Sequence, residues 1–212
     1  MSHDDFAVEP IKGLPEFLPR GEVILWQGRP DWWHLTVQSM NLWWVVGYFG
    51  ILTLWRFFTV VDLLPLDRAI AVSLPFVVIG AIVAGLFMIV GYVQARATVY
   101  TITNRRVAMR VGAALTVTLN LPFTQIENAA LAKRRNGHGN IALETKGSTK
   151  FSFLVLWPHA RPWHFAKPQP TLRAIADADA VANILAKAAK ARLIEEQNKS
   201  HADTPILGVA AQ

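Results

Sequence analysis

Two long stretches without a charged side chain constrain the fold more than any other feature of the sequence. No group from Leu35 to Trp55 is charged at pH 7, and Ala69 to Val93 form a second uncharged stretch. Each is long enough to cross roughly 30 Å of hydrocarbon as a helix. Neither shows the polar face of a helix in a soluble core. The pattern predicts two transmembrane helices, at about 36–58 and 69–93, with Pro75 near the start of the second.

The connection between these stretches, Thr59 to Arg68, is short, so the two helices should form an antiparallel hairpin with both chain ends on one side. Arginine is more frequent on the side of the chain ends than in the connection. Arg56 and Arg68 flank the connection, whereas six arginines lie outside the hairpin: Arg20, Arg29, Arg96, Arg105, Arg106 and Arg110. The positive-inside rule then predicts a multi-pass membrane protein with both termini in the cytoplasm.

Small residues in the second stretch allow a close helix contact. Gly80, Ala81, Ala84 and Gly85 form overlapping small-xxx-small spacings, which let helix backbones approach one another. They either close the hairpin or dock a helix of another protein.

After Ala97 the apolar period changes from helical to alternating, which is typical of half-buried strands. Strands are expected at 98–103, 106–110, 115–121, 125–131, 140–145 and 151–156, followed by a Pro-rich extended loop at 157–170. An amphipathic helix should run from Asp177 to Glu196. We expect an α+β membrane protein with four parts: a cytoplasmic segment (1–34), a transmembrane helical hairpin (35–93), a small antiparallel β domain capped by the helix (94–196), and a disordered tail (197–212).

The net charge of +6 is distributed unevenly: it is −3 up to Arg68 and +9 after Gln94. This is either ordinary cytoplasmic positive bias or a surface for anionic lipid or an acidic partner. Lys133, Arg134 and Arg135 are the densest basic run. They are either a solvated loop or the contact for such a partner. Nucleic acid is disfavoured, since no aromatic residues interleave with this run.

Tryptophan and arginine gather before the hairpin and in the Pro-rich loop, and both residue types dominate interface hot spots. The candidate partner-binding residues are Trp26, Arg29, Trp32, Trp33, Trp157, His159, Arg161 and Trp163. They could form a docking surface, or join the amino-terminal segment to the β domain. Alternatively, the rings seal the domain onto the lipid headgroups.

No recognised catalytic motif occurs in the sequence. There is no cysteine, and no nucleophile elbow, P-loop, dinucleotide fingerprint or HExxH motif is present. The two stretches contain no carboxylate that would mark a proton path. The spacing of His159 and His164 matches no common metal site. We therefore expect neither an enzyme nor a bound metal.

The β region carries a family resemblance. Residues 100–112, YTITNRRVAMRVG, and 121–126, LPFTQI, resemble the bacterial PH-like domain. The resemblance implies a PH-like fold for the basic region. Such domains often follow a pair of membrane helices, as is expected here.

A second resemblance covers about residues 11–195. Residues 13–32 (GLPEFLPRGEVILWQGRPDW), 156–163 (LWPHARPW) and 168–173 (PQPTLR) are similar to the PuhB-type photosynthetic complex assembly proteins of purple bacteria. This implies a location in the bacterial inner (intracytoplasmic) membrane and a non-enzymatic assembly factor for the reaction centre and its light-harvesting complex. The expected partners are reaction-centre and possibly light-harvesting subunits, with a homodimer also possible.

Pigment is not expected within the hairpin. None of the six histidines lies inside the two stretches, and a buried bacteriochlorophyll usually needs such an axial ligand. His34 stands at the entry of the first stretch, either as a polar group at headgroup level or as an interfacial pigment ligand. We predict no cofactor.

Overall fold

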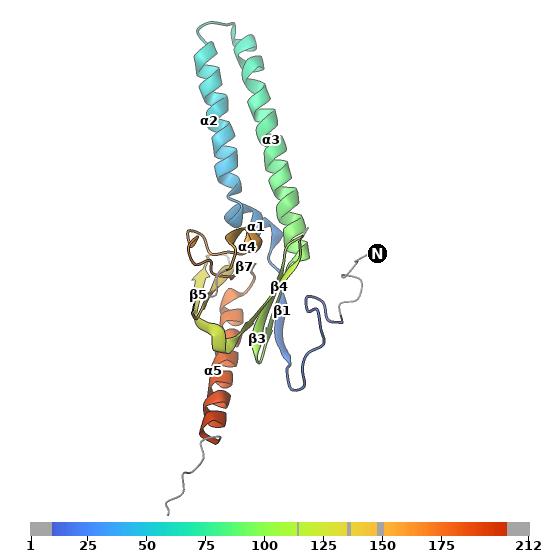
Figure 1. Ribbon diagram of the computed structural model, residues 1–212. Coiled ribbons are helices and arrows are strands. Elements are labelled where there is room, and N and C mark those ends of the chain that lie inside the picture. Colours follow the sequence, from blue (N-terminus) through green and yellow to red (C-terminus); the bar gives the residue numbers. More distant parts are fainter. Residues whose placement is uncertain (1–9, 114, 135–136, 148–150, 203–212) are drawn as a thin grey trace, which may run out of the picture.

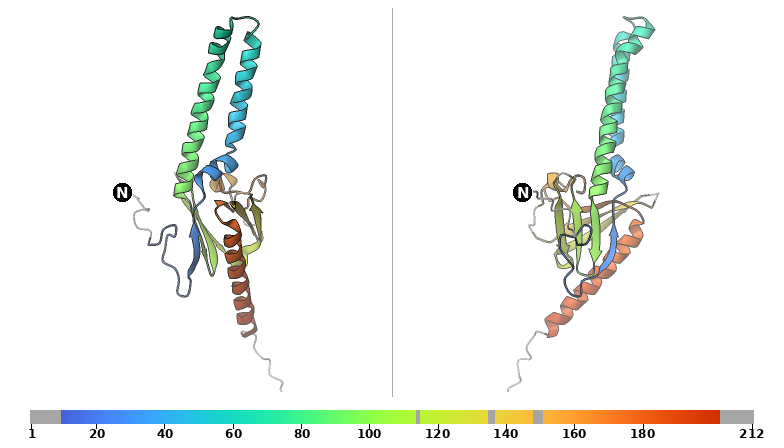
Figure 2. Two further views of the ribbon diagram at one scale, coloured as in Figure 1. Left: turned by 180° about the vertical axis from the view of Figure 1, so that it is seen from behind. Right: turned by 90° about the vertical axis from the view of Figure 1, so that its right-hand side faces the viewer.

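The computed structural model describes residues 10–113, 115–134, 137–147 and 151–202. It contains a pair of long helices, which project from one end of a domain built on two antiparallel sheets (Figure 1). The last helix leaves the domain at the opposite end, as the rear and side views in Figure 2 show. The expected combination of two apolar helices with an antiparallel β domain is confirmed.

The helical pair consists of α2 (Leu42–Val60) and α3 (Leu66–Ala97), joined by residues 61–65. At about 1.5 Å per residue they span about 28 and 48 Å. Both are long and apolar enough to cross a membrane by length and composition. In the most apolar 18-residue segments of α2 and α3, only 6% and 11% of the residues are buried. Apolar side chains are therefore exposed along both helices.

The first long helix begins later than predicted, because the helical conformation is interrupted at Met40 and Asn41. Residues 32–39 form a separate helix, α1 (Trp32–Ser39), and Asn41 adopts a left-handed backbone with φ of 56° before α2 begins. Asparagine tolerates this conformation better than most residues. The predicted span at 36–58 is thus wrong at its start. Helix α1 lies at the base of the helical pair (Figure 1).

The position of Pro75 also differs from the prediction. Helix α3 starts at Leu66, directly after Pro65, so that Pro75 lies in its interior. The charges of Asp67 and Arg68 suggested a start at Ala69. A carboxylate in the first turn is, however, favoured by the helix dipole, and Asp67 occupies that turn.

The first sheet has the strand order β1-β2-β3-β4. Its members are β1 (Ile24–Gly28), β2 (Val99–Thr103), β3 (Arg106–Val111) and β4 (Val117–Pro122). Tyr100 pairs with Met109, and Val107 pairs with Leu121. Strand β1 precedes the helical pair in sequence, yet it pairs with β2. Part of the segment predicted as a separate region at 1–34 therefore belongs to the β domain.

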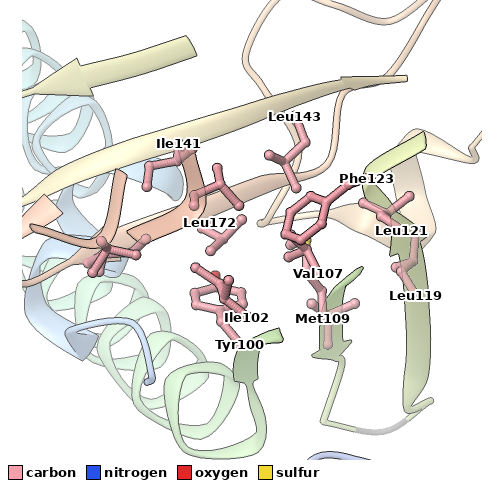
Figure 3. Close-up of a cluster of buried hydrophobic side chains, with 14 of the residues drawn as sticks. Tyr100, Ile102, Val107, Met109, Leu119, Leu121, Phe123, Ile141, Leu143 and Leu172 are labelled. Atoms are coloured by element: carbon pink, nitrogen blue, oxygen red, sulfur yellow. The ribbon is translucent and has the colours of Figure 1, made fainter. Parts of the chain in front are cut away.

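The second sheet has the order β5-β6-β7, with β5 (Ile126–Lys133), β6 (Gly139–Thr145) and β7 (Thr171–Ile175). A short 3-10 helix (Phe123–Gln125) connects β4 to β5. Facing side chains of the two sheets form one core, in which Tyr100, Ile102 and Met109 meet Ile141, Leu143 and Leu172 (Figure 3). Helix α5 (Ala178–Ala202) closes this core with Val181, Leu185 and Ala188.

Two local predictions in this region are wrong, and one strand was missed. The strand expected at 151–156 is the one-turn helix α4 (Phe153–Leu156). Strand β7, which was not predicted, follows directly after the expected Pro-rich loop. The last helix continues to Ala202, so 197–202 are helical rather than part of a tail. Residues 203–212 lie outside the described residues.

Candidate functional site

A groove lies where the helical pair meets the β domain. Its volume is about 320 Å³. One wall comes from the end of α1 and the start of α2, and the other from α4, the Pro-rich loop and β7. The lining residues are Gln38, Ser39, Asn41, Phe153, Trp157, Pro158, Ala160, Pro162, Trp163, Phe165 and Arg173. Two of the predicted partner-binding residues, Trp157 and Trp163, are thus brought to one place.

The outer rim of this groove is aromatic and strongly exposed. Trp163 is 87% exposed and Phe165 is 61% exposed. Their rings meet edge to face at 6.4 Å, and the Phe165 ring lies 4.7 Å from that of Phe153. Trp163 also has a left-handed backbone with φ of 64°, which is uncommon for a bulky residue. Exposed rings of this size favour either a partner surface or a lipid headgroup layer.

The inner wall carries a buried positive charge. Arg173 on β7 is only 4% exposed. Its Nε donates to Ser39 Oγ over 2.9 Å, and a terminal nitrogen donates to the Ala160 carbonyl over 3.2 Å. Burial lowers the pKa of the Arg173 guanidinium, and the charge of Arg134 acts in the same direction. Of the ion pairs between described residues, none includes Arg173. The groove therefore has a wall suited to an anionic group.

His159 lies near the start of the Pro-rich loop. It was predicted as a candidate partner-binding residue, but it is completely buried. Burial, and after it the Arg173 charge, lowers the pKa of His159 to about 3. The imidazole is consequently neutral, with one donor and one acceptor nitrogen. In this position His159 cannot contact a partner directly.

A directed chain of hydrogen bonds runs through this imidazole. The Arg173 backbone N–H donates to the Tyr100 hydroxyl over 3.2 Å, and Tyr100 lies 2.6 Å from His159 Nδ1. His159 Nε2 lies 3.0 Å from Thr98 Oγ1, which donates to the Gln94 carbonyl. All these groups are satisfied when Tyr100 donates to Nδ1 and Nε2–H donates to Thr98. Burial also raises the pKa of Tyr100, which keeps its proton in place.

A second groove of about 290 Å³ adjoins the first and shares Gln38, Pro162 and Arg173 with it. Arg134 and Arg161 add two further guanidinium groups to its lining. Arg161 donates to Gln169 Oε1 over 2.9 Å. This is where Arg134 of the predicted basic run lies. Lys133 instead forms an ion pair with Asp179 of α5, and Arg135 lies outside the described residues.

The remaining predicted partner-binding residues lie elsewhere. Trp26 packs on the core from β1, and Arg29 follows that strand in the chain. Trp32 and Trp33 are about 40% exposed on α1, at 41% and 39%, and the Trp32 ring meets Tyr92 of α3 at 6.1 Å. No ring contact between described residues joins them to the Pro-rich loop. The eight predicted residues thus divide among separate places.

The small residues of α3 face α2 only in part. A Cβ at Gly80 would lie 2.7 Å from Phe49 Cβ, so this glycine lets the two helices approach. Ala81 and Ala84 line a shallow groove of about 290 Å³ beside that contact. A Cβ at Gly85 would meet nothing within 4 Å. Gly80 therefore serves the helical pair itself.

Comparison with known proteins gives three findings. The profile of the bacterial PH domain matches residues 43–189. The chain is 45% identical over 203 residues to an uncharacterized 23.7 kDa protein from the region 5′ of puhA in Rhodobacter capsulatus, covering 93% of each chain. A crystal structure of a Shewanella loihica protein with a pleckstrin-homology domain aligns over 43% of this chain and 71% of its own, with 12% identity and a TM-score of 0.29.

Proposed function

The chain belongs to the bacterial PH domain family, and from this premise we propose that it is a non-enzymatic assembly factor for the photosynthetic reaction centre and its light-harvesting complex. In this proposal α2 and α3 cross the bacterial inner membrane as a hairpin. The β domain stays on the cytoplasmic side with both chain ends. Subunits under assembly bind where the hairpin and the domain meet.

Insertion in the membrane is supported by the surface of the hairpin. Trp44, Ile51 and Trp55 of α2 are 81%, 66% and 71% exposed. Along α3, Ile82 and Ile89 are 58% and 61% exposed. Apolar surface on this scale is unfavourable in water, and in hydrocarbon a helix satisfies its own backbone groups. The antiparallel arrangement would return the chain to its starting side.

A role in photosynthesis is supported by sequence relationships. The relative in Rhodobacter capsulatus is named for its place in the region 5′ of puhA, a photosynthesis gene region. The signature segments at 13–32 and 156–163 resemble PuhB-type assembly proteins. The second of these segments supplies Trp157 and Pro162 to the groove.

The groove with Trp163 on its rim and Arg173 in its wall carries the proposal. Gln38, Ser39 and Asn41 place it at the end of the hairpin, where a subunit helix beside α2 or α3 would leave the hydrocarbon. The rings offer apolar contact to the first extramembrane residues of that subunit, and the guanidinium offers a charge to a carboxylate. Such binding would cover surfaces that later pack within the finished complex.

The test replaces the gene that encodes the corresponding protein in a purple bacterium with genes for variants of this chain. Trp163→Ala should lower the reaction-centre content, measured by near-infrared absorption of membranes, and should leave the total pigment pool intact. Leu154→Ala is the matched control, because Leu154 is 84% exposed on α4 and does not line the groove. Normal assembly in a strain that lacks the gene altogether would refute the proposed function.

The alternative function is recognition of anionic lipid headgroups, which is favoured by the second groove. Arg134, Arg161 and Arg173 converge there, and the chain after Gln94 carries a net charge of +9. For this test the full chain is reconstituted in nanodiscs, because β1 belongs to the domain. Anionic lipid should raise its unfolding temperature in a salt-sensitive manner. Replacing Arg134 and Arg161 by alanine should abolish the increase, whereas replacing Lys187 and Lys190 on α5 should not.

A further inference from the structure

Three side chains with metal-ligating atoms meet at the base of the hairpin, and none of them lines either groove. Asp31, His34 and His138 each offer one ligand atom, and these atoms all lie within 4.8 Å of one another. Asp31 Oδ1 is 2.7 Å from His34 Nδ1. The rings of His34 and His138 are stacked with their centroids 4.0 Å apart and an interplanar angle of 17°. All three residues are half-buried.

The backbone around each of these residues is held by hydrogen bonds. The N–H of Asp31 donates to the Ala174 carbonyl of β7 over 2.9 Å. Asp31 is also the N-cap of α1 and accepts from the His34 N–H over 2.8 Å. In the β5–β6 turn, the Arg134 N–H donates to the His138 carbonyl over 2.9 Å. The sheet and the helix thus position ligands from segments that are far apart in sequence.

We propose that Asp31, His34 and His138 form a binding site for a divalent transition-metal ion such as Zn²⁺. Two imidazoles and one carboxylate are ligands that suit this class of ion, with bonds of about 2.0–2.2 Å. The stacked rings would rotate about χ2, a broad torsion for histidine, to direct one nitrogen each at a common point. Three protein ligands leave a further coordination position for water or for a group from a partner.

Helix capping explains only part of this arrangement. The contact between Asp31 and His34 is what a capped helix requires, but His138 takes no part in that cap. A bound ion would join the first turn of α1 to the β5–β6 turn. It would thereby fix the base of the hairpin against the second sheet.

The experiment uses the full chain in detergent, purified without a histidine tag and freed of metal with a chelator. Equilibrium dialysis against micromolar Zn²⁺, with the metal measured by mass spectrometry, should give one ion per chain. The absence of cysteine means that the ion must be held by nitrogen and oxygen ligands. His138→Ala should weaken binding by at least about 100-fold, since loss of an outer-shell partner alone costs 10- to 100-fold.

Two further variants separate ligation from folding. Asp31→Asn keeps a good N-cap residue and removes the charge, so it should weaken Zn²⁺ binding while the metal-free protein unfolds at its usual temperature. His164→Ala removes an imidazole from the Pro-rich loop and should leave binding unchanged. The proposal is overturned if the wild-type chain retains no Zn²⁺ at micromolar concentration. It is equally overturned if His138→Ala and Asp31→Asn bind as tightly as His164→Ala.

Discussion

Replacing Gly91 by alanine should loosen the base of the hairpin, whereas replacing Gly85 in the same helix should not. Gly91 of α3 lies against Thr36 of α1. A Cβ added at position 91 would lie 1.9 Å from Thr36 Oγ1, 2.9 Å from its Cβ and 3.4 Å from its Cα. Rotation of the threonine side chain relieves only the first contact. At position 85 an added Cβ meets nothing within 4 Å.

The magnitude follows from comparing the two variants. In a helix interior, alanine is favoured over glycine by about 0.5–1 kcal/mol, and this gain is common to both positions. Overpacking a close contact costs about 1–3 kcal/mol, and only Gly91→Ala incurs it. The free energies of unfolding should therefore differ by about 1–3 kcal/mol. For a chain of this size that corresponds to a gap of roughly 2–12 °C in Tm.

The assay is thermal unfolding in one detergent, followed by tryptophan fluorescence. Thr36→Ala combined with Gly91→Ala should recover part of the loss, because it removes the clash with Oγ1 and keeps the clash with Cβ. The reasoning fails if Gly91→Ala unfolds at the same temperature as Gly85→Ala, or at a higher one. That result would mean that α1 does not pack closely on α3.

Three further predictions concern buried polar groups. Because burial lowers the pKa of His159 to about 3 from 6.5, its contribution to stability should be complete above pH 6.5 and fall by up to about 1.4 kcal/mol per pH unit towards pH 3; urea unfolding of His159→Gln should lack this slope. Arg173→Met should lower Tm through loss of the bonds to Ser39 and Ala160, each worth about 1.5–3 kcal/mol, and a Tm equal to the wild type would contradict this. Glu22→Gln should weaken the contact with Arg106 Nε at 2.8 Å, and faster hydrogen exchange in β1 would be the measurable sign.

The sequence was sufficient to predict the two apolar helices, because length and the absence of charge decide that question locally. It was insufficient for the break between α1 and α2. Gln38, Ser39 and Asn41 are uncharged, so they did not interrupt the apolar pattern. The left-handed backbone of Asn41 becomes necessary only because α1 packs on the end of α3.

The strands that were missed depend on distant partners. Strand β1 pairs with β2 across the whole hairpin. Strand β7 follows Pro168 and Pro170, and prolines usually argue against a strand. Pro170, however, lies just outside β7 and offers its carbonyl to the Leu143 N–H over 2.8 Å. Neither strand has a recognisable local sequence pattern, since each is defined by pairing with a strand that is distant in the sequence.

The candidate site was predicted only in its exposed part. Trp157 and Trp163 were identified because large rings in a Pro-rich loop are suited to interfaces. Arg173 was missed, since its role depends on Ser39, which lies 134 positions away in the chain. His159 was wrongly chosen as a partner-binding residue for the same reason: Thr98 and Tyr100, which form its hydrogen bonds, come from a different part of the sequence.

The junction between α3 and β2 determines how the domain can act. Thr98 alone separates the end of the helix from the first residue of the strand. Its N–H and its hydroxyl both bond to the Gln94 carbonyl, and its Oγ1 also contacts His159. A helix that passes into a sheet without a flexible linker cannot let the domain swing. The aromatic groove is therefore held at one height and one orientation relative to the hairpin.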